Sequence, residues 1–307
     1  MDTAGGTSPE RLDAPGITLD RQLSLIVPDA VPGRYQVQVH PDWNCPTVPQ
    51  GGLMAALAAR AMQLELGLSD DGPSTNGDGL QLRSLTTVFA AAVPAGPVTI
   101  DVRVLREGRS MAQVMATARS PEAPAGHTTL AAFGRRRAGF DFTDWTMPDV
   151  PPPEACRSFR DPPPPDVVQE GEVFAFWAKV IDGRPAMGHA PWEDYEPTTS
   201  DAAFWYRLED LPFQADGQLD PLALVVYADT MPGSIGERMG PTKTDWWCPS
   251  VDLTVHLLRE ARSEWILGHS KAHRSNDGYA SLQMHLWDPA TGLVAAATQT
   301  TYFVFPD

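Results

Sequence analysis

The chain has 307 residues, of which 42% are hydrophobic, and its 39 acidic residues outnumber its 23 basic residues to give a formal charge of −16. This length supports two ordinary domains or one large one, with a core that needs no disulfides. The acidic balance repels phosphate backbones and anionic lipid surfaces, so nucleic acid and membranes are not expected partners. Three of the 23 basic residues are lysines and the other twenty are arginines, so a bound anion would need a local arginine cluster.

The cysteines and histidines do not indicate a metal site. Cys45, Cys156 and Cys248 are widely spaced and form no C-x-x-C pair, and the seven histidines form no H-E-x-x-H group. We therefore expect no metal, no cofactor and no disulfide framework. Unpaired cysteines of this kind are typical of a reducing, cytoplasmic setting.

The first domain is predicted to follow an N-terminal tail at 1–29 and to occupy residues 30–138. Alternation of apolar and polar residues predicts a first strand, and a turn rich in glycine then precedes a largely apolar helix. Further strand-like segments follow, joined by Pro-Gly and Glu-Gly turns. The predicted elements are a strand at 33–39, a helix at 53–66, and strands at 82–91, 98–108, 110–119 and 128–136.

Residues 139–171 are predicted to be a linker. The segment contains the runs PDVPPPEA and RDPPPPDVVQEG. Proline at this density removes backbone donors and favours extended polyproline conformation over packed structure.

The second domain, residues 172–307, repeats the order of the first. Asp220 and Pro221 are typical of a helix start, with a carboxylate at the N-cap and proline at the first helical position. The apolar run LALVVYADTM extends this helix until Pro232. The predicted strands are 172–181, 202–210, 250–260, 264–274, 279–288 and 292–305.

The repeated order of elements predicts an internal duplication. Each half has one mainly apolar helix and about five antiparallel strands, and a helix that is apolar on most faces must be buried. We therefore predict an α+β fold with two antiparallel sheets, each wrapped around a central helix and joined edge to edge.

Three polar residues of the second half stand where a buried sheet would normally have apolar ones. Asp229 follows an apolar helix, Ser250 opens one strand, and Gln299 lies late in the last strand. Each alone is more simply explained by a turn, a strand end or a backbone hydrogen bond. Together they could hold a water molecule against an electrophilic carbonyl.

Several short segments resemble the acyl-coenzyme A thioesterase II family, whose fold is a tandem pair of hot-dog domains. They are VPQGGLMAALAARA and VLREGRSM in the first half, and YADT, SVDLTVHLL, EWIL and GLVAAATQ in the second. The resemblance implies a catalytic water held by Asp229, Ser250 and Gln299. The family usually has threonine where Ser250 stands, and an alternative register would put Thr254 there.

The same resemblance suggests how a substrate could be bound. Backbone N–H groups at a helix start stabilise the oxyanion in the family, which here implies Gly51 and Gly52. Arg106, Arg109 and Arg135 are candidate contacts for the phosphates of coenzyme A, although charged residues at strand ends are more often solvated surface.

The implied function is hydrolysis of an acyl-CoA or a related acyl thioester to free acid and thiol. Two alternatives stay open: a non-hydrolytic enzyme of specialised metabolism, such as a dehydratase, lyase or cyclase, and a non-catalytic acyl-binding module. The sequence leaves acyl length, pathway and assembly into a homo-oligomer open.

Overall fold

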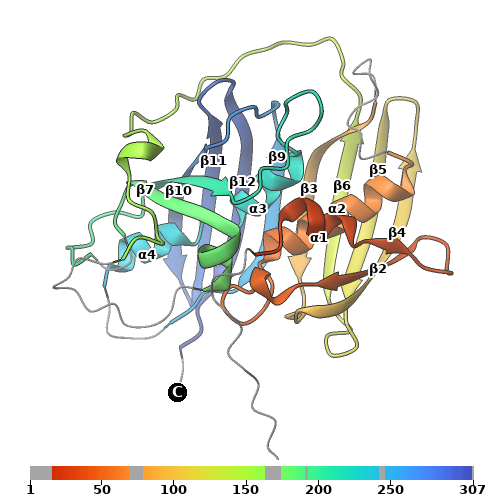
Figure 1. The fold of residues 1–307 in the computed structure, drawn as a ribbon, viewed down its shortest axis with the longest axis horizontal. Helices are drawn as coiled ribbons and strands as arrows, with labels where there is room; N and C mark the ends of the chain where they lie inside the picture. The colour runs from red at the N-terminus through yellow and green to blue at the C-terminus, as the bar shows by residue number, and fades with distance from the viewer. Residues whose placement is uncertain (1–15, 69–78, 163–173, 191–192, 242–245, 306–307) are drawn as a thin grey trace, which may run out of the picture.

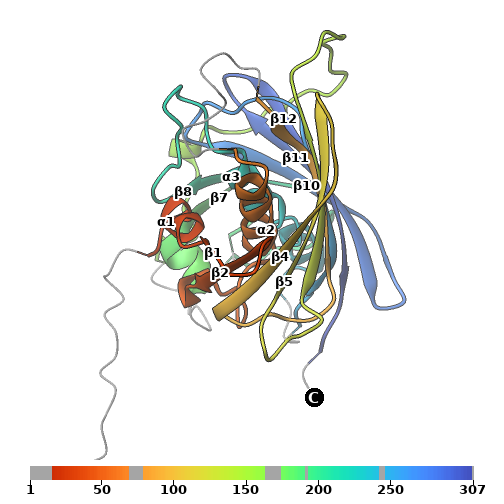
Figure 2. The same cartoon turned by 90° about the vertical axis from the view of Figure 1, so that its right-hand side faces the viewer.

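The computed structural model describes residues 16–68, 79–162, 174–190, 193–241 and 246–305. Within them, twelve strands form one antiparallel sheet in the order β1-β2-β4-β5-β6-β3-β9-β12-β11-β10-β8-β7. The sheet curls around two helices, α2 and α3, that lie on its concave side (Figures 1 and 2). This arrangement confirms the predicted α+β fold with a helix inside each half of the sheet.

The strands of the first half are β1 (Val27–Pro28), β2 (Arg34–Val39), β3 (Gln81–Phe89), β4 (Gly96–Glu107), β5 (Met111–Arg119) and β6 (His127–Gly134). Those of the second half are β7 (Ile181–Met187), β8 (Ala202–Leu208), β9 (Ser250–Leu257), β10 (Ile266–Asn276), β11 (Tyr279–Asp288) and β12 (Gly292–Tyr302). The α-helices are α1 (Leu19–Ser24), α2 (Gly51–Glu65), α3 (Pro221–Ala228) and α4 (Gly233–Met239).

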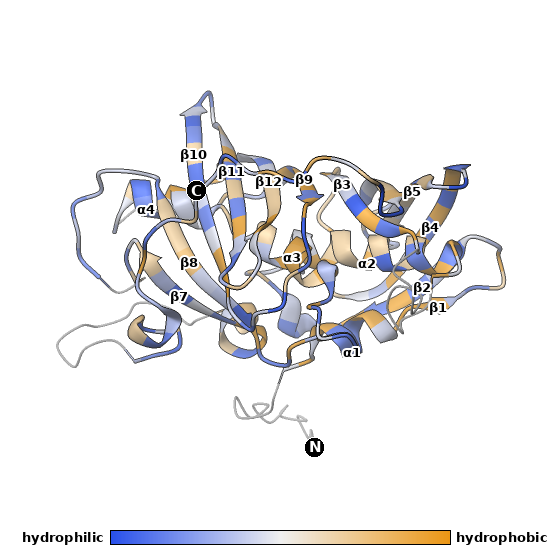
Figure 3. Cartoon of the chain, turned by 90° about the horizontal axis from the view of Figure 1, so that it is seen from above, coloured by the Kyte–Doolittle hydropathy of each residue, from blue (hydrophilic) through white to orange (hydrophobic). Residues whose placement is uncertain are grey.

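The central helices begin where local capping chemistry places them. The Gln50 side chain caps α2 by accepting from the Leu53 N–H at 3.0 Å. Asp220 caps α3 by accepting from the Leu222 N–H at 2.8 Å, with Pro221 at the first helical position as predicted. Figure 3 colours most of both helices as hydrophobic, and both are buried on nearly all sides, as expected for helices that are apolar all round.

α2 and α3 run antiparallel against each other. The Gln50 Nε2 donates to the Val226 carbonyl at 2.8 Å, which ties the start of α2 to the end of α3. At the other end, Arg60 of α2 forms an ion pair with Asp220 at 3.2 Å. The start of each helix therefore lies beside the end of the other, and this geometry creates two junctions at opposite ends of the helix pair.

The two halves of the sheet meet through β3 and β9. Thr86 pairs with Thr254 in the antiparallel register, and their hydroxyl oxygens lie 3.0 Å apart. The prediction that the sheets join edge to edge is therefore correct, and the result is a continuous sheet rather than two separate ones.

The described part of the predicted linker crosses the outer face of the second half. The Trp205 Nε1 donates to the Pro151 carbonyl at 2.8 Å, and the ring of Trp145 lies 4.2 Å from that of His285. The segment is extended, as its prolines predict, apart from a single 3₁₀ turn at Pro153–Ala155. Residues 163–171 lie outside the described residues.

Three local predictions differ from the structure. The strand predicted at 172–181 is instead a π-helical turn at Phe176–Val180, with both end residues buried, and the strand starts at Ile181. The predicted tail contains helix α1, which buries Leu19 and Leu23 on one face, while residues 1–15 lie outside the described residues. The apolar helix stops at Ala228 instead of extending to Pro232, and helix α4, which was not predicted, follows it.

Candidate active site

Asp229 lies at the junction where α3 ends and α2 begins. It is the C-cap residue of α3, so its side chain is no longer part of the helical surface and points toward the first turn of α2. The Asp229 Oδ2 accepts from the Gly52 N–H at 2.9 Å. A carboxylate in this position is stabilised by the free N–H groups and the positive end of the α2 dipole.

Two neighbouring strands bring the other predicted side chains to this carboxylate. The Gln299 Nε2 from β12 donates to the Asp229 Oδ1 at 2.5 Å and also lies 2.7 Å from the Ser250 Oγ. The Ser250 Oγ donates to the same Oδ1 at 3.3 Å. Asp229, Ser250 and Gln299 therefore form one hydrogen-bonded cluster, although 21 to 70 residues separate them in sequence.

The acceptor oxygen of Gln299 is available for a further hydrogen bond. Gln299 is 2% exposed, and its Oε1 is buried with no partner among the described residues. A buried acceptor without a partner is costly, so such a group commonly marks a position where a bound molecule donates a hydrogen bond.

Burial makes Asp229 a stronger base than an exposed aspartate. Removal from solvent disfavours the charged form and raises the pKa of Asp229 to about 6, against the lowering effect of hydrogen bonds from Gly52, Gln299, Ser250 and Gly51. The residue still keeps part of its surface accessible, which a substrate would need. At neutral pH the group is mostly ionised, and it holds a proton more strongly than a surface carboxylate.

Glycine is required at the start of α2. A Cβ on Gly52 would lie 2.7 Å from the Val225 carbonyl oxygen and 2.9 Å from the Asp229 Cβ. A Cβ on Gly51 would lie 2.8 Å from the ring of Phe89 and 3.1 Å from the Asp229 Oδ2. The absence of side chains at these positions lets α2 approach both α3 and the carboxylate.

The position of the Gly52 N–H differs from the expected oxyanion role. In the predicted role, the Gly51 and Gly52 N–H groups face a substrate carbonyl. In the structure Gly52 donates to Asp229, and Gly51 also donates to this carboxylate. The helix start therefore fixes the carboxylate, and its role toward an oxyanion stays a prediction.

The alternative residue Thr254 lies away from the cluster. Its hydroxyl is bonded to that of Thr86 in the middle of the sheet, whereas Ser250 at the start of β9 faces Asp229. The structure therefore brings Ser250, and not Thr254, to Asp229, and the catalytic role of Ser250 stays a prediction.

The arginines suggested for coenzyme A lie near the other helix junction. The Arg135 Nε donates to the Arg109 carbonyl at 2.9 Å, and Arg135 lines a pocket shared with Asp220 at the start of α3. Arg106 is exposed on β4, near the same hairpin end. The structure does not bring these three residues to Asp229.

Sequence reasoning missed two thiols beside the cluster. Burial, followed by the Asp229 charge, raises the pKa of both Cys45 and Cys248 to about 12. Both are therefore neutral thiols at physiological pH and poor nucleophiles. No spacing pattern in the sequence links these cysteines to the site.

An aromatic pair borders the site on the first-half side. Phe89, at the end of β3, meets the ring of His127 edge to face with a centroid distance of 4.9 Å. Burial lowers the pKa of His127 to about 4, so this ring is neutral at physiological pH. Neither residue was selected from the sequence.

The described residues contain no group of three or more His, Cys, Asp or Glu side chains placed to hold a metal ion. None of the helices in this part of the chain is long and apolar enough to cross a membrane.

Both repeats match models of known domains. Residues 39–134 match the acyl-CoA thioesterase N-terminal domain, and residues 153–303 match the acyl-CoA thioesterase C-terminal domain. The chain belongs to the acyl-CoA thioesterase family. The two matches lie on either side of the first part of the linker and include all three residues of the Asp229 cluster.

Solved structures share the tandem hot-dog fold over nearly the whole chain. A hot-dog protein of unknown function from Alicyclobacillus acidocaldarius has a TM-score of 0.73 and 23% identity, covering 94% of this chain and 98% of the other. The acyl-CoA thioesterase II TesB2 of Mycobacterium marinum has a TM-score of 0.68 and 19% identity, covering 93% and 98%. The TesB protein of Mycobacterium avium subsp. paratuberculosis has a TM-score of 0.68 and 18% identity, with the same coverage. A search of curated proteins found no match.

Proposed function

We propose that this protein hydrolyses an acyl-CoA to the free acid and coenzyme A, with a water molecule activated by Asp229. The observation that carries the proposal is the cluster of Asp229, Gln299 and Ser250, in which a carboxylate with a raised pKa contacts both an amide and a hydroxyl. A thioester carbonyl is electrophilic enough to be attacked by water that loses its proton to a positioned base.

The attacking water is proposed to bind between the three side chains. The Ser250 contact with Asp229 is the longest in the cluster at 3.3 Å, so a water could displace it and donate a proton to the Asp229 Oδ1. The Gln299 Oε1 offers a further acceptor that would orient the water. Holding the water in this way would convert a random encounter into a positioned attack.

The reaction then balances without a covalent enzyme intermediate. The water oxygen forms a bond to the carbonyl carbon while Asp229 accepts the proton, which gives a tetrahedral oxyanion. Collapse of this oxyanion breaks the carbon–sulfur bond, and the proton on Asp229 passes to the departing thiolate. The positive end of α2 lies beside the reacting centre and favours the negative charge that develops there.

The neutral thiols support a water mechanism over a cysteine nucleophile. Cys45 and Cys248 lie near the carboxylate, but their raised pKa keeps the thiolate fraction negligible at neutral pH. In a hydrolytic reaction through Asp229, the acyl group is therefore not transferred to a cysteine of the enzyme.

The test is release of free thiol from a panel of acyl-CoAs of different chain length. Asp229→Asn is expected to lower kcat/KM by about 10²–10⁴-fold, because it removes the base and keeps the shape. Asp252→Asn is the matched control: Asp252 is another partly buried aspartate of the second half, on β9, but it accepts from the Thr300 N–H and does not belong to the Asp229 cluster. Its activity should stay within about twofold of the wild type.

Equal thiol release by wild type and Asp229→Asn would contradict the proposal. Mass spectrometry of the products separates the remaining alternatives. An acyl-CoA that returns altered but still joined to coenzyme A would indicate a dehydratase, lyase or cyclase. Acyl-CoA binding without any turnover would indicate a binding module.

A further inference from the structure

The Asp229 site has a counterpart at the other end of the helix pair. Thr86 and Thr254 face each other where β3 pairs with β9, so a local two-fold axis relates residues of β3 to those 168 positions later in β9. Ser250 then corresponds to Leu82. A β-bulge follows both positions. The pairing of β3 with β6 shifts register between Leu82 and Ser84. The pairing of β9 with β12 shifts between Ser250, which pairs with Thr301, and Asp252, which pairs with Thr300.

The catalytic side chains have no equivalents at this second position. Gln299 pairs with Leu253, and the corresponding pair in the first half is Ala131 with Leu85. Asp229 lies nine residues after Asp220, the N-cap of α3. The residue nine positions after Gln50, the N-cap of α2, is Ala59. Apolar Ala59, Leu82 and Ala131 therefore stand where a second Asp, Ser and Gln would be, and all three are buried.

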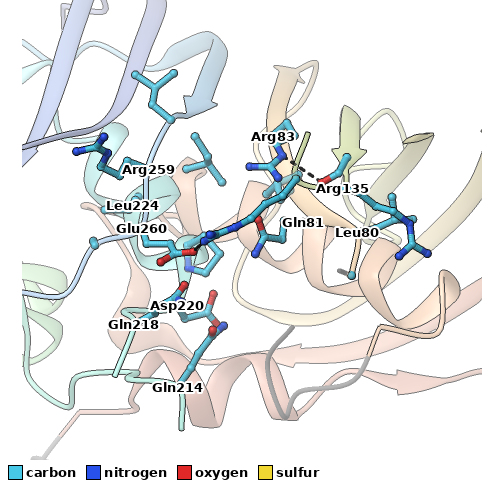
Figure 4. A pocket seen from close by; sticks show the side chains of 18 of the residues that line it. Leu80, Gln81, Arg83, Arg135, Gln214, Gln218, Asp220, Leu224, Arg259 and Glu260 are labelled. Carbon is cyan, nitrogen blue, oxygen red and sulfur yellow. Dashed lines mark hydrogen bonds and ion pairs between the residues drawn. The ribbon is translucent and has the colours of Figure 1, made fainter. Parts of the chain in front are cut away.

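A large pocket of about 1050 Å³ nonetheless opens at this second junction. It lies between the end of α2 and the start of α3 and includes Leu82, the counterpart of Ser250. Figure 4 shows that Arg83 and Arg135 of the first half face Arg259 and Glu260 of the second half across it. The two repeats thus share this pocket, as they share the Asp229 site.

The pocket is strongly basic in an acidic protein. Its lining contains seven arginines and three carboxylates, a formal charge of +4 in a chain whose total is −16. This is the local arginine cluster that an anionic ligand requires. Arginine presents a planar set of donors that matches phosphate oxygens in a two-pronged geometry.

Arg83 is the residue that most clearly indicates a ligand. It occupies the bulge position of β3, is half-buried, and has no carboxylate partner among the described residues. Its Nε donates to the Gly134 carbonyl at 3.1 Å, which leaves the rest of the guanidinium available. Burial, followed by the charge of Arg136, lowers the pKa of Arg83, so a nearby anion would relieve an unfavourable arrangement.

The carboxylates in the pocket offset only part of this charge. Glu260 pairs with both Arg136 and Arg262, and Asp141 pairs with Arg259. One carboxylate shared by two arginines leaves a net positive charge around Arg83 and Arg136.

We propose that this pocket binds a phosphorylated small molecule of nucleotide size through Arg83, Arg136 and their neighbours. The volume exceeds what a single phosphate fills and is at the upper end of known small-molecule sites. Leu68, Leu80 and Leu257 line the pocket, are partly exposed and provide apolar surface for a base or another ring. The charge of +4 complements the several negative charges of a diphosphate or triphosphate.

This ligand is separate from the thioester that reacts at Asp229. The 15-residue α2 runs from one junction to the other, and at 1.5 Å per residue it spans about 22 Å. Binding in the arginine pocket therefore does not depend on the proposed hydrolysis and is tested without measuring turnover.

The experiment is isothermal titration calorimetry of the full chain with ATP, coenzyme A, inorganic pyrophosphate and adenosine. ATP or coenzyme A should bind, with affinity that falls as salt rises, and adenosine should bind at least tenfold more weakly. Tighter binding of ATP would identify a free nucleotide as the preferred ligand. Tighter binding of coenzyme A would identify the coenzyme. Pyrophosphate shows how much of the affinity the phosphates supply.

Three variants assign the binding to this pocket. Arg83→Gln should lower the affinity for the nucleotide at least tenfold. Glu260→Gln should raise this affinity, because Arg136 and Arg262 lose their shared carboxylate. Arg103→Gln removes an exposed arginine of β4 outside the pocket and should leave affinity unchanged. Arg137→Gln, which alters an exposed pocket arginine, is a second test if Arg83→Gln does not fold.

The proposal is overturned if none of the phosphorylated probes binds, if adenosine binds as tightly as ATP, or if Arg83→Gln or Arg137→Gln in folded form binds like the wild type. Binding that Asp229→Asn abolishes while Arg83→Gln retains it would also overturn the proposal, because it would place the ligand at the other junction.

Discussion

The two repeats share an order of elements but contribute different parts to the Asp229 site. The first repeat supplies backbone N–H groups at the start of α2 and the aromatic ring of Phe89. The second supplies all three polar side chains, Asp229, Ser250 and Gln299. A site built at the junction of two repeats can therefore lose its side chains at one end without loss of the fold.

Helix length explains part of this asymmetry. α3 ends after eight residues, so Asp229 becomes a C-cap whose carboxylate reaches the N–H groups of α2. α2 has 15 residues, so its equivalent position, Ala59, lies within the helix and is packed in the core. The short helix therefore ends in a carboxylate that faces α2, where the longer helix has a small apolar residue packed in the core.

The largest effect predicted from this difference is on the pH dependence of stability. Burial raises the pKa of Asp229 from 3.8 to about 6. The folded state then binds the proton more strongly than the unfolded state, so the contribution of Asp229 to stability is present below pH 3.8 and is lost as pH rises through about 6. The shift corresponds to a loss of about 3 kcal/mol.

The Asp229→Asn variant should not show this loss of unfolding free energy as the pH rises. Urea unfolding from pH 4 to pH 8 should show the variant gaining stability relative to the wild type by up to about 3 kcal/mol, mostly below pH 6.5. Asp252→Asn, treated in parallel, controls for the general effect of removing a carboxylate. Parallel stability profiles for wild type and Asp229→Asn would show that the carboxylate is not buried as described.

A second prediction concerns the contribution of the first repeat. Gly52→Ala places a Cβ 2.7 Å from the Val225 carbonyl oxygen and should push α2 away from α3. We expect a loss of about 2 kcal/mol of unfolding free energy, together with reduced turnover, because the N–H group that holds Asp229 moves with the helix.

Gly236→Ala is the matched control for this change. Gly236 also lies in a helix, but no heavy atom is within 4 Å of its added Cβ. Alanine there should be neutral or stabilising by up to about 1 kcal/mol. Equal thermal stability of the two variants would contradict the close contact between α2 and α3.

The smallest predicted effect separates the two candidate hydroxyls. Ser250→Ala should lower kcat/KM by about fivefold, because it removes a 3.3 Å hydrogen bond to the carboxylate worth about 1 kcal/mol. Thr254→Ala should leave turnover unchanged, since that hydroxyl bonds to Thr86 in the sheet. Thiol-release assays that show the opposite ranking would select Thr254 instead.

The sequence predicted the fold well where local chemistry determines it. The start of α3 at Asp220 and Pro221 follows from capping, and strands β8 to β12 of the second half lie where the sequence pattern predicts them. The apolar run before Ile181 predicts a strand but forms a helical turn, because a short apolar run fits a buried strand and a buried helical turn equally well. Helix α1 within the predicted tail has only a weak sequence signal, the two apolar residues Leu19 and Leu23 four positions apart after a capping threonine.

The site was less accessible to sequence reasoning than the fold. The meeting of Asp229, Ser250 and Gln299 was inferred through resemblance, because no local pattern links residues in three separate elements. The neighbouring Cys45 and Cys248 were missed for the same reason.

The pH dependence of kcat/KM for acyl-CoA hydrolysis tests the central claim most directly, since it reports the ionisation of the free enzyme. If Asp229 is the base, activity should be low in acid, rise through an apparent pKa of about 6, and level off above it. Residual activity of Asp229→Asn should lack this step. A wild-type profile that is flat between pH 5 and 7, or a step that persists in the variant, would contradict the assignment of Asp229.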